Sequence, residues 1–113
     1  IYNGAPDLSA TVSTMKQRPG VRILLSHSPD VFPALDPAVA LTLVGHTHCG
    51  QVRLPLIGAL WIPSDYGRRF ACGRFDAPGR TMIVGGGVGT SGLPIRLMNP
   101  PEFWIITLVP RLQ

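Results

Sequence analysis

The stretch Leu41–His48 (LTLVGHTH) places two histidines, His46 and His48, directly after an apolar run and a glycine. A short apolar run of this kind is typical of a buried strand, and side chains two residues apart on a strand leave the same face. Neutral imidazole is the commonest protein ligand for transition metals. The stretch therefore predicts a strand that ends in a pair of metal-binding side chains.

The remaining histidine, His27, follows a second apolar run, Val21–Ser26. A continuous apolar strand is typically buried on both faces in a layered α/β fold. Two adjacent strands would bring His27, His46 and His48 to one sheet edge, where they could hold one metal or bridge a pair. A lone histidine at a strand end is more often a hydrogen-bonded structural residue, but here all three histidines end apolar runs. We therefore predict a metal site with these three ligands.

The rest of the chain predicts a single α/β domain that becomes rich in strands and turns after residue 50. Leu8, Val12 and Met15 form one apolar helical stripe, and Asp7 is placed to cap its first turn. Strands that alternate with helical segments favour parallel neighbours. We expect a strand end at residues 1–4, a helix over 7–17, a helical piece at 31–35, strands over 21–26, 41–44 and 51–54, a hairpin of 69–75 with 80–84, and a final strand over 102–109.

The composition narrows the classes of function. The 113 residues suit one domain, and they are 45% hydrophobic but only 14% charged, well below the usual quarter or so. Such a chain has either a large core or a surface that something else covers. The net charge is +4, but the basic residues are scattered and form no basic helix, which argues against nucleic-acid binding. No apolar stretch approaches the roughly 18 residues of a membrane span.

Several weaker motifs are open to more than one interpretation. Residues 87–92 match G-x-G-x-x-G, but Pro94 follows within two residues and no helix is indicated, so we treat the match as accidental. A dinucleotide-binding module, which rests on this glycine run alone, stays a third alternative. Cys49 and Cys72 lack C-x-x-C spacing, and Cys49 is either a bystander or an additional soft ligand. Asp30 either orients His27 or simply forms a turn. The apolar segment 54–61 either contacts lipid or a hydrophobic substrate, or packs against another part of the protein.

Two segments carry a resemblance to a known family: Ile23–Asp30 (ILLSHSPD) and Gly45–Gln51 (GHTHCGQ). With support from residues 84–89, 94–96 and 100–108, the chain resembles the calcineurin-like metallophosphoesterases, in particular the YkuE-like bacterial branch of predicted phosphohydrolases. The resemblance implies a four-layer αββα sandwich, of which residues 1–113 would form the C-terminal half as one partial domain.

The same resemblance implies a site with two divalent metals, Mn, Fe or Zn, about 4 Å apart. His27 and His46 would ligate one metal and His48 the other. The implied reaction is the hydrolysis of phosphate mono- or diesters, including lipid-linked ones, by metal-activated water. Arg96 is a candidate phosphate contact, because guanidinium matches phosphate geometry, or it is an ordinary surface arginine.

The chain departs from the family pattern in two ways. Cys49 stands where the family usually has glycine, which leaves metal preference open. The Asp-x-His, Gly-Asp-x-x-Asp and Gly-Asn-His elements that supply the other ligands do not occur in residues 1–113. We therefore expect the partner of this chain to be a missing N-terminal half, and the isolated chain to be inactive and prone to self-association. The alternative is a non-catalytic metal-binding or interaction module that uses His27, His46, His48 and Cys49.

Overall fold

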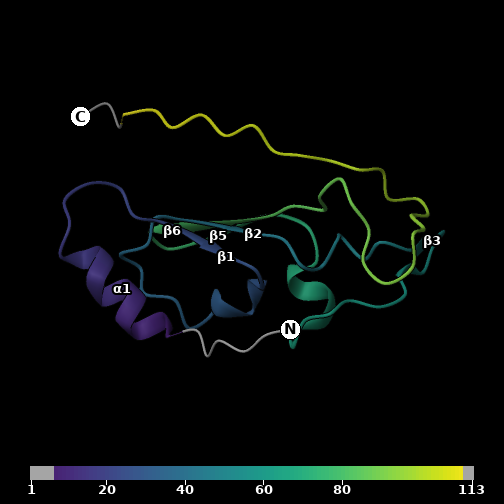
Figure 1. The fold of residues 1–113 in the computed structure, drawn as a ribbon, viewed down its shortest axis with the longest axis horizontal. Coiled ribbons are helices and arrows are strands. Elements are labelled where there is room, and N and C mark those ends of the chain that lie inside the picture. The colour runs from purple at the N-terminus through teal and green to yellow at the C-terminus, as the bar shows by residue number, and fades with distance from the viewer. Residues whose placement is uncertain (1–6, 111–113) are drawn as a thin grey trace.

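The computed structural model describes residues 7–110, so the strand end expected at residues 1–4 lies outside the described part. In chain order the elements are α1 (Leu8–Lys16), β1 (Ile23–Ser26), the 3-10 helix η1 (Pro29–Val31), β2 (Leu41–Val44), β3 (Arg53–Leu54), β4 (Gly58–Ala59), the 3-10 helix η2 (Gly67–Phe70), β5 (Gly73–Ala77) and β6 (Arg80–Val84). The chain is a mixed α/β structure (Figure 1). None of the helices in residues 7–110 is long and apolar enough to cross a membrane.

Four strands form one sheet in the order β1-β2-β6-β5. The strands β1, β2 and β6 are parallel neighbours, which confirms the predicted parallel pairing. The predicted hairpin is also present, but its first strand is Gly73–Ala77 rather than residues 69–75. Ser26 pairs with Val44, so β1 and β2 end level with each other. Short β3 and β4 form a separate antiparallel ribbon. Residues 7–110 thus contain one large sheet, and a four-layer sandwich remains an expectation for the whole protein.

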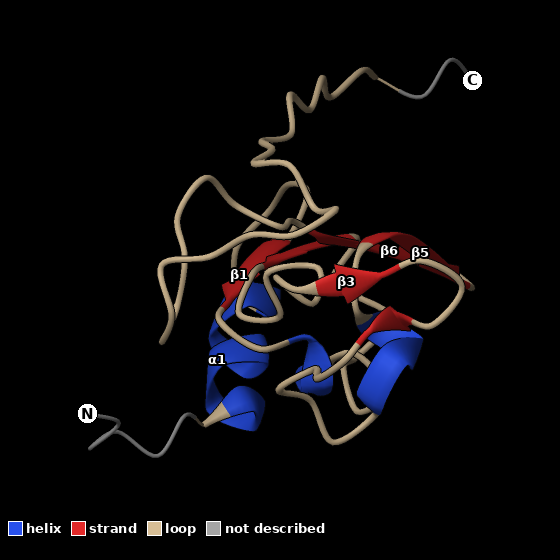
Figure 2. Cartoon of the chain, turned by 90° about the vertical axis from the view of Figure 1, so that its right-hand side faces the viewer, coloured by secondary structure: helices blue, strands red, loops and turns tan. Residues whose placement is uncertain are grey.

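One face of this sheet is covered by α1, η1 and η2 (Figure 2). The predicted cap of α1 is confirmed, because Asp7 Oδ1 accepts a hydrogen bond of 2.8 Å from Ala10 N. This satisfies one of the backbone donors that a helix start leaves unpaired. The core on this face consists of Val12, Leu24, Phe32, Leu35, Val39, Val44, Phe70, Met82 and Val84.

The opposite face of the sheet is only partly covered. Leu25 lies there in register with Leu43 and Ile83, and its side chain is 75% exposed. The expectation that the apolar run 21–26 is buried on both faces is therefore wrong. The run has the composition of a two-sided strand, but within residues 7–110 the helices lie on one side only. Exposed apolar surface of this kind is what self-association would need, and self-association stays a prediction.

The predicted strand over residues 102–109 is also wrong. Residues 101–110 have no regular secondary structure and run apart from the sheet (Figure 1). Phe103 and Ile105 are 77% and 84% exposed. Apolar, β-branched composition favours an extended chain, but a strand also needs a neighbouring edge that takes up its backbone hydrogen bonds. Within residues 7–110 this segment pairs with neither of the two outer strands, β1 and β5.

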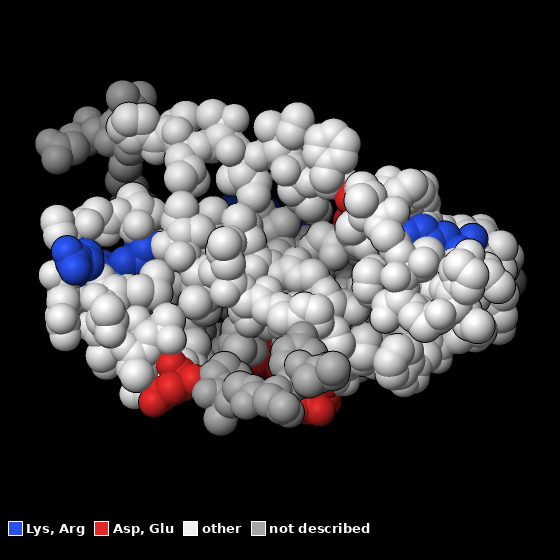
Figure 3. Space-filling model, in the orientation of Figure 1, with Lys and Arg blue, Asp and Glu red and all other residues white. Residues whose placement is uncertain are grey.

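Charge is sparse on the face shown in Figure 3, where basic residues lie near the two ends and acidic residues lie mostly along the lower edge. Uncharged side chains cover the area between them. This view contains no continuous basic stripe, which agrees with the sequence argument against nucleic-acid binding.

Thr42 in the centre of β2 is fully buried, and its Oγ1 has no hydrogen-bond partner among the described residues. A buried hydroxyl without a partner costs about 1–3 kcal/mol. We expect Thr42→Val to raise the free energy of unfolding by about 1–2 kcal/mol in urea titrations. Thr81→Val is the matched control, because Thr81 Oγ1 donates to Asp76 Oδ1 at 2.7 Å and its removal should give no gain. A loss of stability in Thr42→Val would contradict the argument.

Candidate metal-binding site

The structure brings His27 and His46 together at the carboxyl end of the sheet. His27 directly follows β1, and His46 follows β2 after Gly45. Gly45 N donates to the His27 carbonyl at 3.3 Å, which extends the pairing of the two strands by one step. The two imidazole centroids lie 4.4 Å apart with the rings tilted by 51°. Parallel pairing with level strand ends is the physical reason for this approach.

His46 and His48 are presented by a turn rather than by a strand, which corrects the reasoning from strand periodicity. β2 ends at Val44. His46, His48 and Cys49 all have left-handed backbone conformations, with φ of 64°, 48° and 54°. This region costs a residue other than glycine about 1–2 kcal/mol. We call residues 45–50 the histidine turn; its conformation persists only because surrounding contacts hold it.

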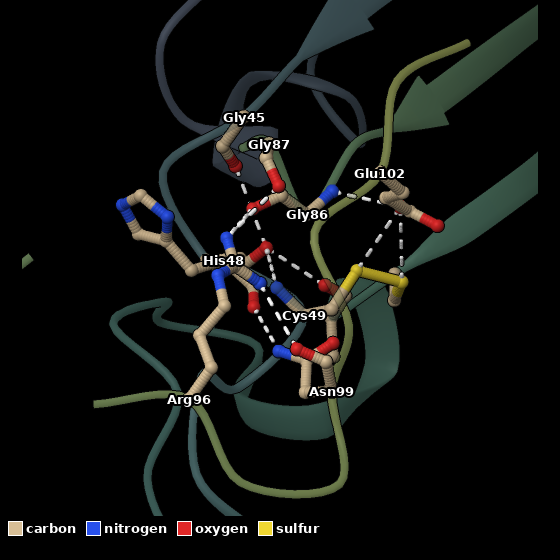
Figure 4. The surroundings of a disulfide bond; sticks show 11 residues. Gly45, His48, Cys49, Gly86, Gly87, Arg96, Asn99 and Glu102 are labelled. Carbon is tan, nitrogen blue, oxygen red and sulfur yellow. Dashed lines mark hydrogen bonds between the residues drawn. A yellow bond between two sulfur atoms is a disulfide. The ribbon is translucent and has the colours of Figure 1, made fainter. Parts of the chain in front are cut away.

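Three contacts hold the histidine turn in place. The buried Thr47 donates its hydroxyl to the Ala71 carbonyl at 2.7 Å. Asn99 Nδ2 donates to the His48 carbonyl at 2.6 Å (Figure 4). A disulfide joins Cys49 to Cys72. Thr47 is buried, and His46, Thr47 and His48 all border the same cavity. No local pattern in the sequence indicates this role of Asn99, because its partner lies 51 positions away.

The disulfide corrects the sequence interpretation of Cys49 as a bystander or a soft metal ligand. In the disulfide its sulfur has no thiolate to offer a metal. A signal for the pairing existed, since these are the only two cysteines of the chain. Their separation of 23 residues, however, does not by itself show that the two Cα atoms approach to 4.7 Å.

The electrostatic environment favours the neutral form of His46. Burial lowers the pKa of this imidazole below its ordinary value of 6.5, and the neighbouring His27 and His48 act in the same direction. Asp30 opposes them. Because the pKa is lowered, the pH must fall further than usual before His46 becomes protonated. A neutral imidazole is the form that can bind a metal.

The three histidines are suitable ligands for a divalent transition metal, because imidazole nitrogen binds Mn, Fe and Zn. The ligand atoms of His27, His46 and His48 do not, however, form one group within 4.8 Å in residues 7–110. His27 and His46 form a close pair of rings, and the assignment of the three histidines to metals stays a prediction. The carboxylate of Asp30 accepts hydrogen bonds from Ser64 Oγ at 2.5 Å and Asp65 N at 3.2 Å, which ties η1 to the loop before η2.

A cavity of about 350 Å³ opens beside His46 and His48. Its apolar wall includes Leu60, Trp61 and Leu93. Gln51 connects the histidine turn to this wall, because its side-chain amide donates to the Leu93 carbonyl at 2.8 Å and its carbonyl accepts from Ser91 N at 2.7 Å. The full lining is His46, Thr47, His48, Gly50, Gln51, Val52, Leu60, Trp61, Pro63, Ser91, Gly92 and Leu93.

Arg96 is directed at backbone carbonyls of the glycine-rich segment. Its guanidinium donates to Gly86 O at 2.7 Å, Gly87 O at 2.9 Å and Gly89 O at 2.6 Å. These bonds fix the loop that follows β6, and the role of Arg96 as a phosphate contact stays a prediction. Residues 85–97 contain no helix. The G-x-G-x-x-G match therefore lacks the helix N-terminus on which a pyrophosphate would sit.

Comparison with known proteins places the chain among its relatives. It is 37% identical to "Uncharacterized metallophosphoesterase YkuE" of Bacillus subtilis over 106 residues, which is 93% of this chain and 36% of that protein. It is 39% identical to an "Uncharacterized metallophosphoesterase" of Aquifex aeolicus over 76% of this chain and 32% of that protein. "Phosphodiesterase YaeI" of Escherichia coli is 36% identical over 78% of this chain and 32% of that protein.

No model of a known protein family matches the chain, and no solved structure matches it. The chain spans about a third of the length of the curated relatives it matches, and in YkuE the match lies in the C-terminal part. Paired parallel strands that end in histidines, together with this level of identity over most of the chain, lead to one conclusion: the chain belongs to the metallophosphoesterase family.

Proposed function

We propose that this chain contributes His27, His46 and His48 to a dinuclear metal phosphoesterase that hydrolyses phosphate mono- or diesters. One observation carries the proposal: the His27 and His46 rings lie 4.4 Å apart at the ends of adjacent parallel strands, in a chain of the metallophosphoesterase family. His27 and His46 would hold one metal and His48 the other. When bound, the two ions would polarise the phosphoryl oxygen and activate the attacking water.

The residues around the ligands act by holding them in position. Thr47 and the Cys49–Cys72 disulfide fix the left-handed histidine turn. Asn99 holds the carbonyl of His48 and so limits how the turn can rotate. Metal affinity and reaction geometry both depend on such supporting contacts, because a ligand that is already placed loses little freedom on binding.

The cavity beside the histidines supports a substrate with an apolar group next to its phosphate. Leu60, Trp61 and Leu93 provide an apolar wall at the side of His46 and His48. A phosphate at the metals would leave an acyl, alkyl or aryl group against this wall. Lipid-linked phosphate esters, as well as simpler aryl esters, have this combination of a charged and an apolar end.

The chain alone would not complete this site. Residues 1–113 contain no Asp-x-His, Gly-Asp-x-x-Asp or Gly-Asn-His element. Without a carboxylate between them, two cations about 4 Å apart repel each other strongly. We therefore expect the isolated chain to bind metal weakly and to be inactive, and the remaining ligands to come from the rest of the whole protein.

The metal dependence of the whole protein tests the proposal. We expect a chelator to abolish hydrolysis of aryl phosphate mono- or diesters, and added Mn²⁺ to restore it, because the metals supply several kcal/mol of transition-state stabilisation.

Within a series of alkyl phosphates, kcat/KM should rise with chain length as the apolar group fills the cavity. A whole protein that is inert with every metal and ester would instead favour the non-catalytic metal-binding module.

A further inference from the structure

Behind the histidine turn, three potential ligands from three distant segments meet at one point. Glu102 Oε1 lies 3.5 Å from Cys49 Sγ and 3.8 Å from Cys72 Sγ (Figure 4). The three ligand atoms all lie within 4.8 Å of one another, and in residues 7–110 no other group of three His, Cys, Asp or Glu residues does so. Cys49 is buried, and Cys72 and Glu102 are half-buried. The group includes none of the three histidines.

The carboxylate of Glu102 is held in place independently of the sulfurs. Gly86 N donates to Glu102 Oε1 at 2.8 Å, and Glu102 N donates to Gly87 O at 3.0 Å. Gly86 also leaves the space that the group occupies. A Cβ at this position would lie 2.9 Å from Cys49 Sγ and 3.3 Å from Glu102 Oε1. The glycine is what lets a carboxylate and two sulfurs approach each other here.

The disulfide alone does not explain this arrangement. Neither sulfur of a disulfide carries a proton, so Glu102 Oε1 faces two electron-rich atoms that cannot donate to it. Cys49 also occupies a left-handed position, with φ of 54°, where glycine would be the relaxed residue. Backbone fit therefore does not account for a cysteine at position 49. A carboxylate against two sulfurs becomes favourable once a cation lies between them.

The distances suit tetrahedral zinc. Zn–S bonds of about 2.3 Å and Zn–O bonds of about 2.1 Å at a tetrahedral angle place sulfur and oxygen about 3.6 Å apart. The observed distances from Glu102 Oε1 to the two sulfurs are 3.5 and 3.8 Å. Only the two sulfurs are too close, because a zinc site needs them about 3.8 Å apart. Breaking the disulfide is the change that releases them.

We propose that reduction of the Cys49–Cys72 disulfide creates a soft divalent-metal site, with Cys49 Sγ, Cys72 Sγ and Glu102 Oε1 as its protein ligands and a water in the fourth position. A dithiol reductant gives two electrons and two protons, so that the S–S bond becomes two thiols while the reductant becomes a disulfide. Metal binding then releases both thiol protons to solvent as the thiolates coordinate the ion. The oxidised chain lacks this site.

This site is separate from the one that the proposed function uses. Its ligands lie on the inner side of the histidine turn, whereas His46 and His48 border the cavity. A metal held by Cys49 and Cys72 would replace the disulfide as the link between the histidine turn and the start of β5. The turn would then stay braced in both redox states.

Cobalt binding to the whole protein tests the proposal, because thiolate-bound Co²⁺ absorbs in the near ultraviolet and imidazole-bound Co²⁺ does not. After reduction with a phosphine, we expect wild-type protein to develop this thiolate band with one equivalent of Co²⁺, and Zn²⁺ to displace it. Oxidised protein should show no such band. Thiol alkylation followed by mass measurement should find the two cysteines unreactive before reduction.

Three variants separate this site from the histidine site. Cys72→Ser should lose the thiolate band, and His48→Ala should keep it. Glu102→Gln retains an oxygen for the Gly86 N–H but not the charge, so it should still form the disulfide while its Co²⁺ affinity falls at least about tenfold. Reduced wild type with two free thiols and no thiolate band would overturn the proposal. So would a band that persists in Cys72→Ser, or two cysteines that are already free before reduction.

Discussion

Replacing His46 by alanine in the whole protein is expected to lower kcat/KM for phosphate esters by at least about 10³-fold. His46 lies 4.4 Å from His27 between ring centroids and also borders the cavity, so in the proposed site it would serve both the metal and the substrate-facing side. Removing one imidazole takes away a ligand that is already in position. His48→Ala should have an effect of similar size.

The metal content of alanine variants should distinguish the two proposed metal positions. If His27 and His46 share an ion, alanine at either should lower the occupancy of the same site, whereas His48→Ala should lower that of the other. Elemental analysis of each purified variant measures this directly. His27→Ala combined with His46→Ala should lose no more metal than either change alone, whereas His46→Ala combined with His48→Ala should lose both ions. Equal metal contents in these two double variants would contradict the assignment to two ions.

The backbone must be controlled for, because His46 and His48 both have left-handed φ values. Asparagine tolerates this conformation better than most residues, so His46→Asn keeps the turn while it removes the imidazole. It should be nearly as inactive as His46→Ala. Lys16→Ala on α1 lies outside the site and should keep full activity. Activity close to wild type in both His46 variants would overturn the proposed site.

Gly50→Ala is expected to destabilise the protein by about 3 kcal/mol or more. Gly50 has φ of 72°, and a Cβ there would lie 2.3 Å from Ala59 Cβ and 2.7 Å from Ile62 Cδ1. The left-handed backbone accounts for about 1–2 kcal/mol and the steric overlap for about 1–3 kcal/mol. Since Gly50 ends the histidine turn, any folded remainder should also have a distorted cavity.

Gly45→Ala is the matched control at the other end of the same turn. A Cβ at Gly45 would meet no atom within 4 Å, and its φ is not in the left-handed region. Its free energy of unfolding should stay within about 1 kcal/mol of wild type. Urea titration of both variants measures the difference. Equal stabilities for Gly50→Ala and Gly45→Ala would show that the turn is not held as tightly as its contacts indicate.

The sequence by itself determined the features that depend on neighbouring residues. The cap and apolar stripe of α1, the apolar runs of β1 and β2, and the hairpin of β5 and β6 follow from local periodicity and turn chemistry. The approach of His27 and His46 follows from the same patterns, because parallel strands share a carboxyl edge. The resemblance to metallophosphoesterases rested on these residues and is confirmed by the comparisons.

Only the tertiary structure decided the features that depend on residues far apart in the chain. The burial of one face of β1 and the unpaired course of residues 101–110 depend on which neighbours are present, not on composition. The left-handed histidine turn is set by Thr47, Asn99 and the disulfide, whose partners lie 24, 51 and 23 positions away. The meeting of Cys49, Cys72 and Glu102 has the same origin. Hydrophobic periodicity records which side of an element is buried, but not which distant group will face it.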